Sequence, residues 1–268
     1  MLAHTLLHPL GAQITGVSAD HLDDRAVDDL RLLLARHGVV VLRDQRLDDH
    51  GLVTFLRHFG NLAFTAGETP VPGHPELNVI SNIGARTPPR STFHVDTSYM
   101  DDPPAFTALL AVTVPQAGGQ TLFSDQYAAY DTLSPDLRAR LDGRTVRHVV
   151  TGVEPGPGEQ TSATHPVFAK HPQTGRIALF LTTPARCAAV SGLDDLDAAQ
   201  VVDLLYAHST RPQHTLRHSW QPGDLVVWDN RCVMHRADHD GVVGDRVMHR
   251  GMATDTHTHH EPHHRRSA

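Results

Sequence analysis

The stretch TLRHSWQPGDLVVWD, residues 215–229, contains two strand-like runs separated by the turn signal WQPGD. Comparable apolar and β-branched runs follow one another from residue 104 onward, separated by turn signals such as QAGGQ and HPQTGR. These further runs are FTALLAVTV (106–114), TLFSD (121–125), TVRHVV (145–150), HPVFAKH (165–171), RIALFL (176–181) and RVMHRGMA (246–253). Short, regularly spaced strands without alternating helices favour an antiparallel barrel or jelly roll over a doubly wound sheet.

Helices flank this mainly β pattern. The helices expected from N-capping residues and apolar periodicity lie over 26–36 after Asp23 or Asp24, from Asp48 or Asp49 to His58, after Ser134–Pro135, and over 197–208. The remaining expected strands are QITGV (13–17), GVVVLRD (38–44) and LNVIS (77–81). Residues 60–92 are otherwise irregular and rich in Gly, Pro, Thr and Asn, which is typical of a functional lid. We expect a single domain over residues 1–254.

Composition excludes several classes of protein. The 268 residues carry 23 Lys+Arg against 30 Asp+Glu, a formal net charge of -7 that disfavours a nucleic-acid binder. No apolar run approaches the roughly 18–20 residues of a membrane span, and the N-terminus lacks the pattern of a signal peptide. Two cysteines, Cys187 and Cys232, are too few for a disulfide framework. We therefore expect a cytoplasmic protein without a membrane or nucleic-acid partner.

Histidine is unusually frequent, with 22 residues in the chain. Five of them lie in the terminal segment THTHHEPHHRRSA, which has no apolar periodicity. We expect residues 255–268 to form a His/Arg-rich disordered tail. The abundance of histidine therefore does not identify a site.

A metal site is indicated by spacing rather than by number. Phe93–His94–Val95–Asp96 places a histidine and a carboxylate two positions apart, and side chains so spaced share one face of an extended strand. His235 follows the strand and turn quoted above. Two histidines and one carboxylate form the facial triad of non-heme Fe(II) oxygenases, which leaves metal positions open for chemistry.

Several motifs in order resemble a known family. HVD is followed by Thr121 in GGQTLFSD, and then by WDNRCVMH and DRVMHR. FHVDTSY, AAYDTLSP, HPQTGR and WQPGDLVVWDNR fit the same pattern, so the chain from about residue 10 to 254 resembles the TauD/TfdA family. The resemblance implies a double-stranded β-helix (jelly-roll) core. It also implies a dioxygenase that uses Fe(II), 2-oxoglutarate and O2, and that splits the cosubstrate to succinate and CO2.

The resemblance assigns roles residue by residue. His94, Asp96 and His235 would be the iron ligands, Arg246 would clamp the distal carboxylate of 2-oxoglutarate, and Thr121 would add a hydrogen bond. A guanidinium suits this task because it binds a carboxylate through paired, charge-assisted hydrogen bonds. The residues expected to bind substrate are Arg250, Thr97, Tyr99 and, on the lid, Arg90. A structural salt bridge is the alternative for Arg250, and residues 228–231 are expected to brace the loop that carries His235.

Departures from the taurine enzymes bear on the substrate. Thr65 stands near the position where those enzymes carry a histidine, their WHTD is FHVD here, and the insert VVTGVEPGPGEQTSATHP is shorter. CVMHRA is closer to the aryloxyalkanoate-degrading branch. We expect hydroxylation of a small anionic molecule, such as a sulfonate, an alkyl sulfate, an aryloxyalkanoate or an amino-acid-like carboxylate. Asp96 favours oxygenation, since halogenating relatives have a small residue there.

Three alternatives stay open on the sequence. The same chemistry could serve a biosynthetic oxidation or a desaturation. A jelly roll could hold Zn or Ni without catalysis, although such a protein has no use for Arg246 and Thr121 as a dicarboxylate clamp. A structural protein could scavenge metal with its tail. Relatives are often dimers or tetramers, and the sequence does not distinguish these states.

Overall fold

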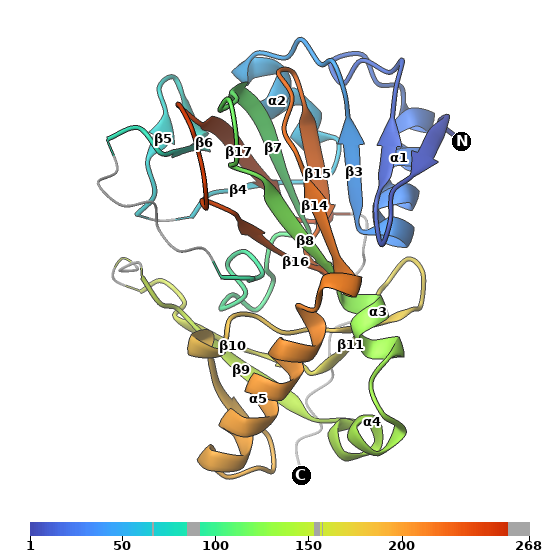
Figure 1. Ribbon diagram of the computed structural model, residues 1–268, viewed down its shortest axis with the longest axis vertical. Coiled ribbons are helices and arrows are strands. Elements are labelled where there is room, and N and C mark those ends of the chain that lie inside the picture. Colours follow the sequence, from blue (N-terminus) through green and yellow to red (C-terminus); the bar gives the residue numbers. More distant parts are fainter. Residues whose placement is uncertain (66, 85–91, 153–155, 157, 257–268) are drawn as a thin grey trace.

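Two facing β-sheets form the upper half of the molecule in Figure 1, which shows the computed structural model. The structure describes residues 1–65, 67–84, 92–152, 156 and 158–256. The larger sheet has the order β1-β2-β3-β15-β7-β17-β6-β5, with β4 also pairing with β17, and the smaller sheet has the order β14-β8-β16. The strands of the larger sheet are β1 (His4–Leu6), β2 (Ala12–Ile14), β3 (Val39–Leu42), β4 (Leu62–Ala63), β5 (Pro70–Val71), β6 (His74–Ser81), β7 (Phe106–Thr113), β15 (Leu225–Asp229) and β17 (Val247–Ala253). Those of the smaller sheet are β8 (Thr121–Asp125), β14 (Thr215–His218) and β16 (Val233–Ala237). This is the jelly-roll core that the strand pattern and the resemblance predicted.

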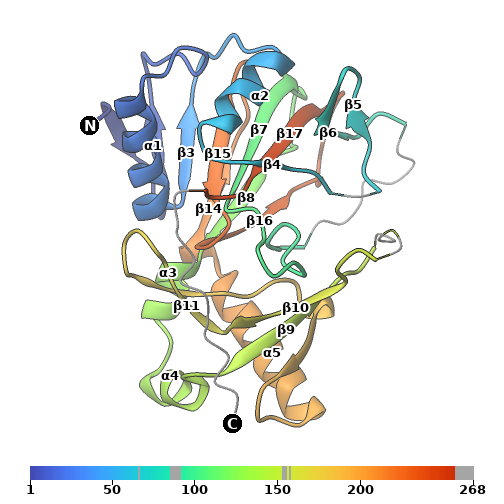
Figure 2. The same ribbon diagram turned by 180° about the vertical axis from the view of Figure 1, so that it is seen from behind.

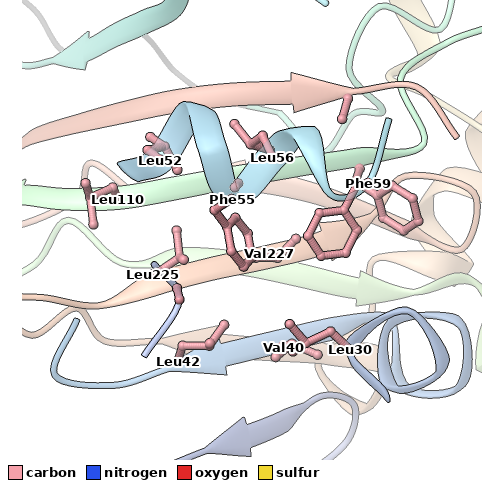
Figure 3. Packing of buried hydrophobic residues seen from close by; sticks show 14 of the residues in the cluster. Leu30, Val40, Leu42, Leu52, Phe55, Leu56, Phe59, Leu110, Leu225 and Val227 are labelled. Atoms are coloured by element: carbon pink, nitrogen blue, oxygen red, sulfur yellow. The ribbon is translucent and has the colours of Figure 1, made fainter. Parts of the chain in front are cut away.

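Two helices cover the outer face of the larger sheet. They are α1 (Asp24–His37) and α2 (Asp49–Arg57), and the carboxylates of Asp23 and Asp48 cap their first turns. Figure 3 shows Phe55 of α2 packed over the sheet that carries Leu225 and Val227. Both helices were expected from the sequence within two residues of their observed ends.

The central strand β15 is buried on both faces. Leu225 and Val227 belong to the hydrophobic cluster under the helices, whereas Val226 and Trp228 belong to the cluster between the two sheets. Alternate residues of a strand point to opposite faces, so both sets of side chains must be apolar. This explains why the run LVVW shows no polar alternation.

A second layer of structure closes the other end of the core (Figure 2). Its strands are β9 (Thr145–Val149), β10 (Ser162–Pro166), β11 (Phe168–Lys170), β12 (Ile177–Leu179) and β13 (Cys187–Val190). Its helices are α3 (Gln126–Asp131), α4 (Pro135–Leu141), α5 (Asp195–Ser209) and the short 3₁₀ turns η1 (Pro184–Arg186) and η2 (Pro212–His214). Residues from these elements pack into one cluster with Phe93 and Val95, which immediately flank His94. The layer therefore supports the segment that carries the first metal-ligand candidate.

Three local expectations differ from the structure. The single strand expected over 165–171 is wrong: β10 and β11 lie in different sheets. The chain changes sheet at Val167, whose N–H donates to Arg144 O at 3.0 Å in continuation of the β10–β9 pairing, while its carbonyl accepts from the Phe180 N–H at 2.8 Å in continuation of the β11–β12 pairing. Helix α3 was not expected, although the Asp125 carboxylate caps it. His235 was expected on a loop, but it lies within strand β16, which pairs with β8.

The end of the described chain is part of the fold. The Asp255 side chain is 8% exposed and pairs with Arg31 and Arg231, although the sequence placed residue 255 in the tail. The rest of the expected tail from residue 257 and the candidate Arg90 lie outside the described residues. No helix in the described part of the chain is both long enough and apolar enough to span a membrane.

Candidate active site

His94 and His235 meet across a single antiparallel bridge. The His94 N–H donates to the His235 carbonyl at 3.0 Å, and the His235 N–H donates back at 3.0 Å. Directly opposed residues of an antiparallel pair project to the same face. The two imidazole rings accordingly lie 4.4 Å apart between centroids.

The Asp96 carboxylate completes a cluster with these rings. Its Oδ1 lies 3.8 Å from His94 Nε2 and its Oδ2 lies 3.8 Å from His235 Nε2. One ligand atom from each of the three residues falls within 4.8 Å of the others. The HxD spacing predicts His94 and Asp96 on one continuous strand, but Asp96 lies in a turn and Thr97 has φ 42°. The turn, rather than a strand pleat, brings the carboxylate to the histidines.

Neighbouring groups orient these ligand atoms. His94 Nδ1 lies 2.8 Å from the Thr92 carbonyl, which can only accept, so Nδ1 carries the proton and Nε2 presents its lone pair to the cluster. The Thr107 hydroxyl donates to Asp96 Oδ2 at 2.8 Å. Both ends of the HxD segment are therefore fixed by hydrogen bonds.

The WDNR motif extends this support. Trp228 Nε1 donates to Asn230 Oδ1 at 3.0 Å, and Asn230 Nδ2 donates to the Thr107 hydroxyl at 2.8 Å. A chain of hydrogen bonds thus runs from the motif through Thr107 to Asp96. Asp229 accepts from Arg231 and pairs with His171. The bracing role expected for residues 228–231 agrees with these contacts, whereas Thr107 was not anticipated because nothing in its sequence context marks it.

Electrostatics fix the charges of the three side chains. Burial lowers the pKa of His235 to about 3 and also lowers the pKa of His94. Burial alone would raise the pKa of Asp96, but His235, Arg250 and His94 together hold it well below its usual range. At neutral pH the cluster therefore holds two neutral imidazoles and one carboxylate, which are the protonation states that metal ligation requires. This donor set suits Fe(II).

Arg246 is a buried cation without a carboxylate partner among the described residues. It is 2% exposed, its Nε donates to the Gly119 carbonyl at 2.9 Å, and Nη2 donates to the Thr121 hydroxyl at 3.4 Å. Burial lowers its pKa to about 10, with no opposing contribution. Burying an unpaired charge is costly, so the fold favours an anion here.

Arg246 and the metal cluster face the same cavity. Its volume is about 250 Å³, and its lining includes His94, His235, Thr121, Arg246 and Arg250. An anion on Arg246 would therefore lie in the space that the two histidines also line.

Three residues near Arg246 were not anticipated from the sequence. Trp220 Nε1 donates to the Thr121 hydroxyl at 3.1 Å, so Thr121 accepts from both Trp220 and Arg246 and keeps its own proton for a ligand. His239 also lines the cavity. Gly119 has φ +69°, and an added Cβ would lie 3.0 Å from Arg246 Cδ. The double glycine of QAGGQ was the signal that could have revealed this close approach.

Of the described residues that were expected to bind substrate, only Arg250 lines the cavity. Arg250 lines the cavity, but its Nη1 donates to Asp96 Oδ1 at 3.2 Å and its Nη2 pairs with Glu68. Thr97 and Tyr99, which follow Asp96 in the chain, are buried and do not line this cavity. The salt bridge that the sequence left as an alternative for Arg250 is therefore present.

Fold and site together define a jelly-roll protein with a two-histidine, one-carboxylate cluster beside a cavity that attracts an anion. Residues 3–252 match the family model "Taurine catabolism dioxygenase TauD, TfdA family", and the chain belongs to this family. It is an oxidoreductase, a dioxygenase that uses Fe(II), 2-oxoglutarate and O2.

Individual relatives are similar along nearly their whole length. The chain is 32% identical to (S)-phenoxypropionate/alpha-ketoglutarate-dioxygenase of Sphingobium herbicidovorans, with 91% of this chain and 92% of the relative covered. It is 33% identical to pentalenolactone F synthase of Streptomyces arenae, with 90% of each covered. The crystal structure of a taurine dioxygenase from Burkholderia xenovorans superposes with a TM-score of 0.83 at 32% identity, covering 95% of this chain and 91% of that one.

Proposed function

We propose that this dioxygenase hydroxylates a small organic anion, with His94, Asp96 and His235 holding Fe(II). Arg246 and Thr121 would bind the distal carboxylate of 2-oxoglutarate. The observation that carries the proposal is the buried guanidinium of Arg246, which lacks a described carboxylate partner and faces the same cavity as the two histidines. In a protein that only stores metal, no bound anion would offset the free-energy cost of burying this charge.

Each side chain has a distinct task in this reaction. Fe(II), 2-oxoglutarate and O2 together supply an oxidation in which the cosubstrate becomes succinate and CO2 and one oxygen atom enters the substrate. His94, Asp96 and His235 set the ligand geometry, and Thr107 fixes the orientation of Asp96. Arg246 orients the cosubstrate through paired, charge-assisted hydrogen bonds.

Arg250 is the candidate for the substrate's anionic group. It lies in β17 four residues beyond Arg246, lines the same cavity, and contacts Asp96 directly. Similarity to a phenoxypropionate dioxygenase and to a taurine dioxygenase supports an anion, because phenoxypropionate carries a carboxylate and taurine a sulfonate.

The iron and cosubstrate assignments can be tested before the substrate is known. Anaerobic addition of Fe(II) and 2-oxoglutarate should produce the weak visible charge-transfer band of the chelate in the native protein. Asp96→Ala should lose the band, and His21→Ala should keep it, since the His21 side chain is 83% exposed and does not line the cavity. An equal band in Asp96→Ala would overturn the ligand assignment.

Substrate binding is tested by succinate release in oxygen with a panel that includes (S)-phenoxypropionate, taurine and uncharged analogues. Arg250→Ala should raise the KM of an anionic substrate by about tenfold or more, given the strength of a buried charge-assisted hydrogen bond. An unchanged KM for every accepted anion would show that Arg250 does not anchor the substrate.

A further inference from the structure

Glu68 pairs with the side of the Arg250 guanidinium that Asp96 does not contact. The Glu68 carboxylate pairs with Arg250 Nη2, while Nη1 is held by Asp96. The Arg250 side chain is 9% exposed and the Glu68 side chain 28% exposed. A buried arginine is thus paired with a glutamate that still reaches solvent.

The surroundings of this ion pair hold donors that Glu68 does not use. Asn78 is fully buried in β6, directly opposite Arg250 in β17, and its Nδ2 has no acceptor among the described residues. Arg250 Nε is likewise buried without an acceptor there. Buried donors normally have partners. The site therefore offers more hydrogen-bond donors than a single carboxylate of Glu68 satisfies.

Thr65 adds another donor at the same place. Its hydroxyl accepts from Arg250 Nη2 at 3.3 Å, so its own proton is available. Asn78 Oδ1 also lies 3.4 Å from Nη2. Arg250, Asn78 and Thr65 thus form a cradle rich in donors, of the kind that an anion with two or three oxygens would fill.

We propose that Glu68 is an internal occupant of the substrate's anion subsite, and that a carboxylate or sulfonate substrate binds Arg250 by displacing it. The inference rests on the proposed function, since it takes Arg250 as the substrate anchor. Exchange of one anion for another keeps Arg250 paired throughout, which avoids an uncompensated buried charge. The released Glu68 can be hydrated because it already reaches solvent. Glu68 thereby lowers the affinity for every anionic substrate, and only anions that compete successfully with it for Arg250 bind.

The test is a calorimetric titration of the enzyme loaded with Mn(II) and 2-oxoglutarate, which prevents turnover. The probes are methanesulfonate and acetate, whose small size makes binding independent of the rest of the substrate pocket. Glu68→Gln keeps the side-chain size and should bind both anions at least tenfold more tightly than the native enzyme. Glu68→Asp, with a shorter reach, should give an intermediate affinity. Methanesulfonamide, which is uncharged, should not distinguish the proteins.

Two controls separate this effect from general changes of charge. Glu76→Gln removes a glutamate from β6 that is also 28% exposed and lies 3.9 Å from Arg57, and it should leave anion affinity unchanged. In an Arg250→Gln background, Glu68→Gln should give no gain. Equal affinity in native enzyme and Glu68→Gln, or no anion binding by either, overturns the inference. Loading with metal and cosubstrate is measured first, so its failure points to the proposed function instead.

Discussion

The His94 and His235 backbones exchange two hydrogen bonds of 3.0 Å, and this bridge holds their imidazole rings 4.4 Å apart. His235 belongs to strand β16, whereas His94 lies outside any named strand and is held by this bridge, by its Nδ1 bond to Thr92 and by the packing of its neighbours Phe93 and Val95. The metal site is therefore formed by tertiary pairing, and groups that never touch the metal should control its affinity.

Thr107 is the first such group. Thr107→Val keeps the shape of the side chain but removes the donor to Asp96 Oδ2, so the carboxylate loses its orientation. We expect metal affinity to fall by about 10- to 100-fold, the usual range for partners of metal ligands. Anaerobic titration with Mn(II) measures it, and Thr107→Ser should restore most of the affinity. Native affinity in the valine variant would exclude a positioning role.

Arg246 should show opposite effects on stability and on cosubstrate binding. Arg246→Met removes a buried charge without a described carboxylate partner, so without 2-oxoglutarate its Tm should equal or exceed that of the native protein. The 2-oxoglutarate concentration for half-saturation should rise by about 100-fold, consistent with loss of a charge-assisted pair. Thermal unfolding with and without 2-oxoglutarate checks both results. A large loss of Tm in the absence of cosubstrate would show that Arg246 has a structural role instead.

His148 should make stability depend on pH. It is fully buried, stacks on Phe180 with centroids 5.7 Å apart, and burial lowers its pKa to about 3. The unfolded chain protonates this histidine below about pH 6.5 while the folded chain does not, so stability falls as pH drops from about 6.5 toward 3. His148→Phe should reduce the loss between pH 7.5 and pH 5 by about 2 kcal/mol in urea unfolding. His21→Phe is the exposed control, and an unchanged pH dependence in His148→Phe would contradict the prediction.

Asp255 should contribute to the stability of the fold, whereas the segment after Thr256 should not. Its carboxylate pairs with Arg31 at 3.0 Å and with Arg231 at 2.8 Å. Asp255→Ala leaves two largely buried guanidinium groups without this partner and should cost about 3 kcal/mol of unfolding free energy. A chain ending at Thr256 should keep native stability and full activity. Loss of activity in that shortened chain would instead support a functional tail.

Much of this site could be predicted from sequence because its residues stand in short motifs that recur in a known family. His94, Asp96 and His235 were singled out by residue type and spacing, and Thr121 and Arg246 by the resemblance to the TauD/TfdA family; the structure brings all five together. Glu68, Asn78 and Thr107 carry no motif. Their importance comes from what they contact, which the order of residues does not reveal.

The strand pattern, the caps and the family motifs predict the jelly roll, the two capped helices and the candidate ligands, because alternation, capping and short motifs are properties of neighbouring residues. Three features are visible only in the folded protein: His235 lies in a strand, a turn rather than a pleat delivers Asp96, and Glu68 pairs with Arg250. These outcomes depend on pairing between distant strands and loops. The fold also buries the Arg246 guanidinium without a carboxylate partner among the described residues, and this positive charge favours an anionic ligand in the cavity.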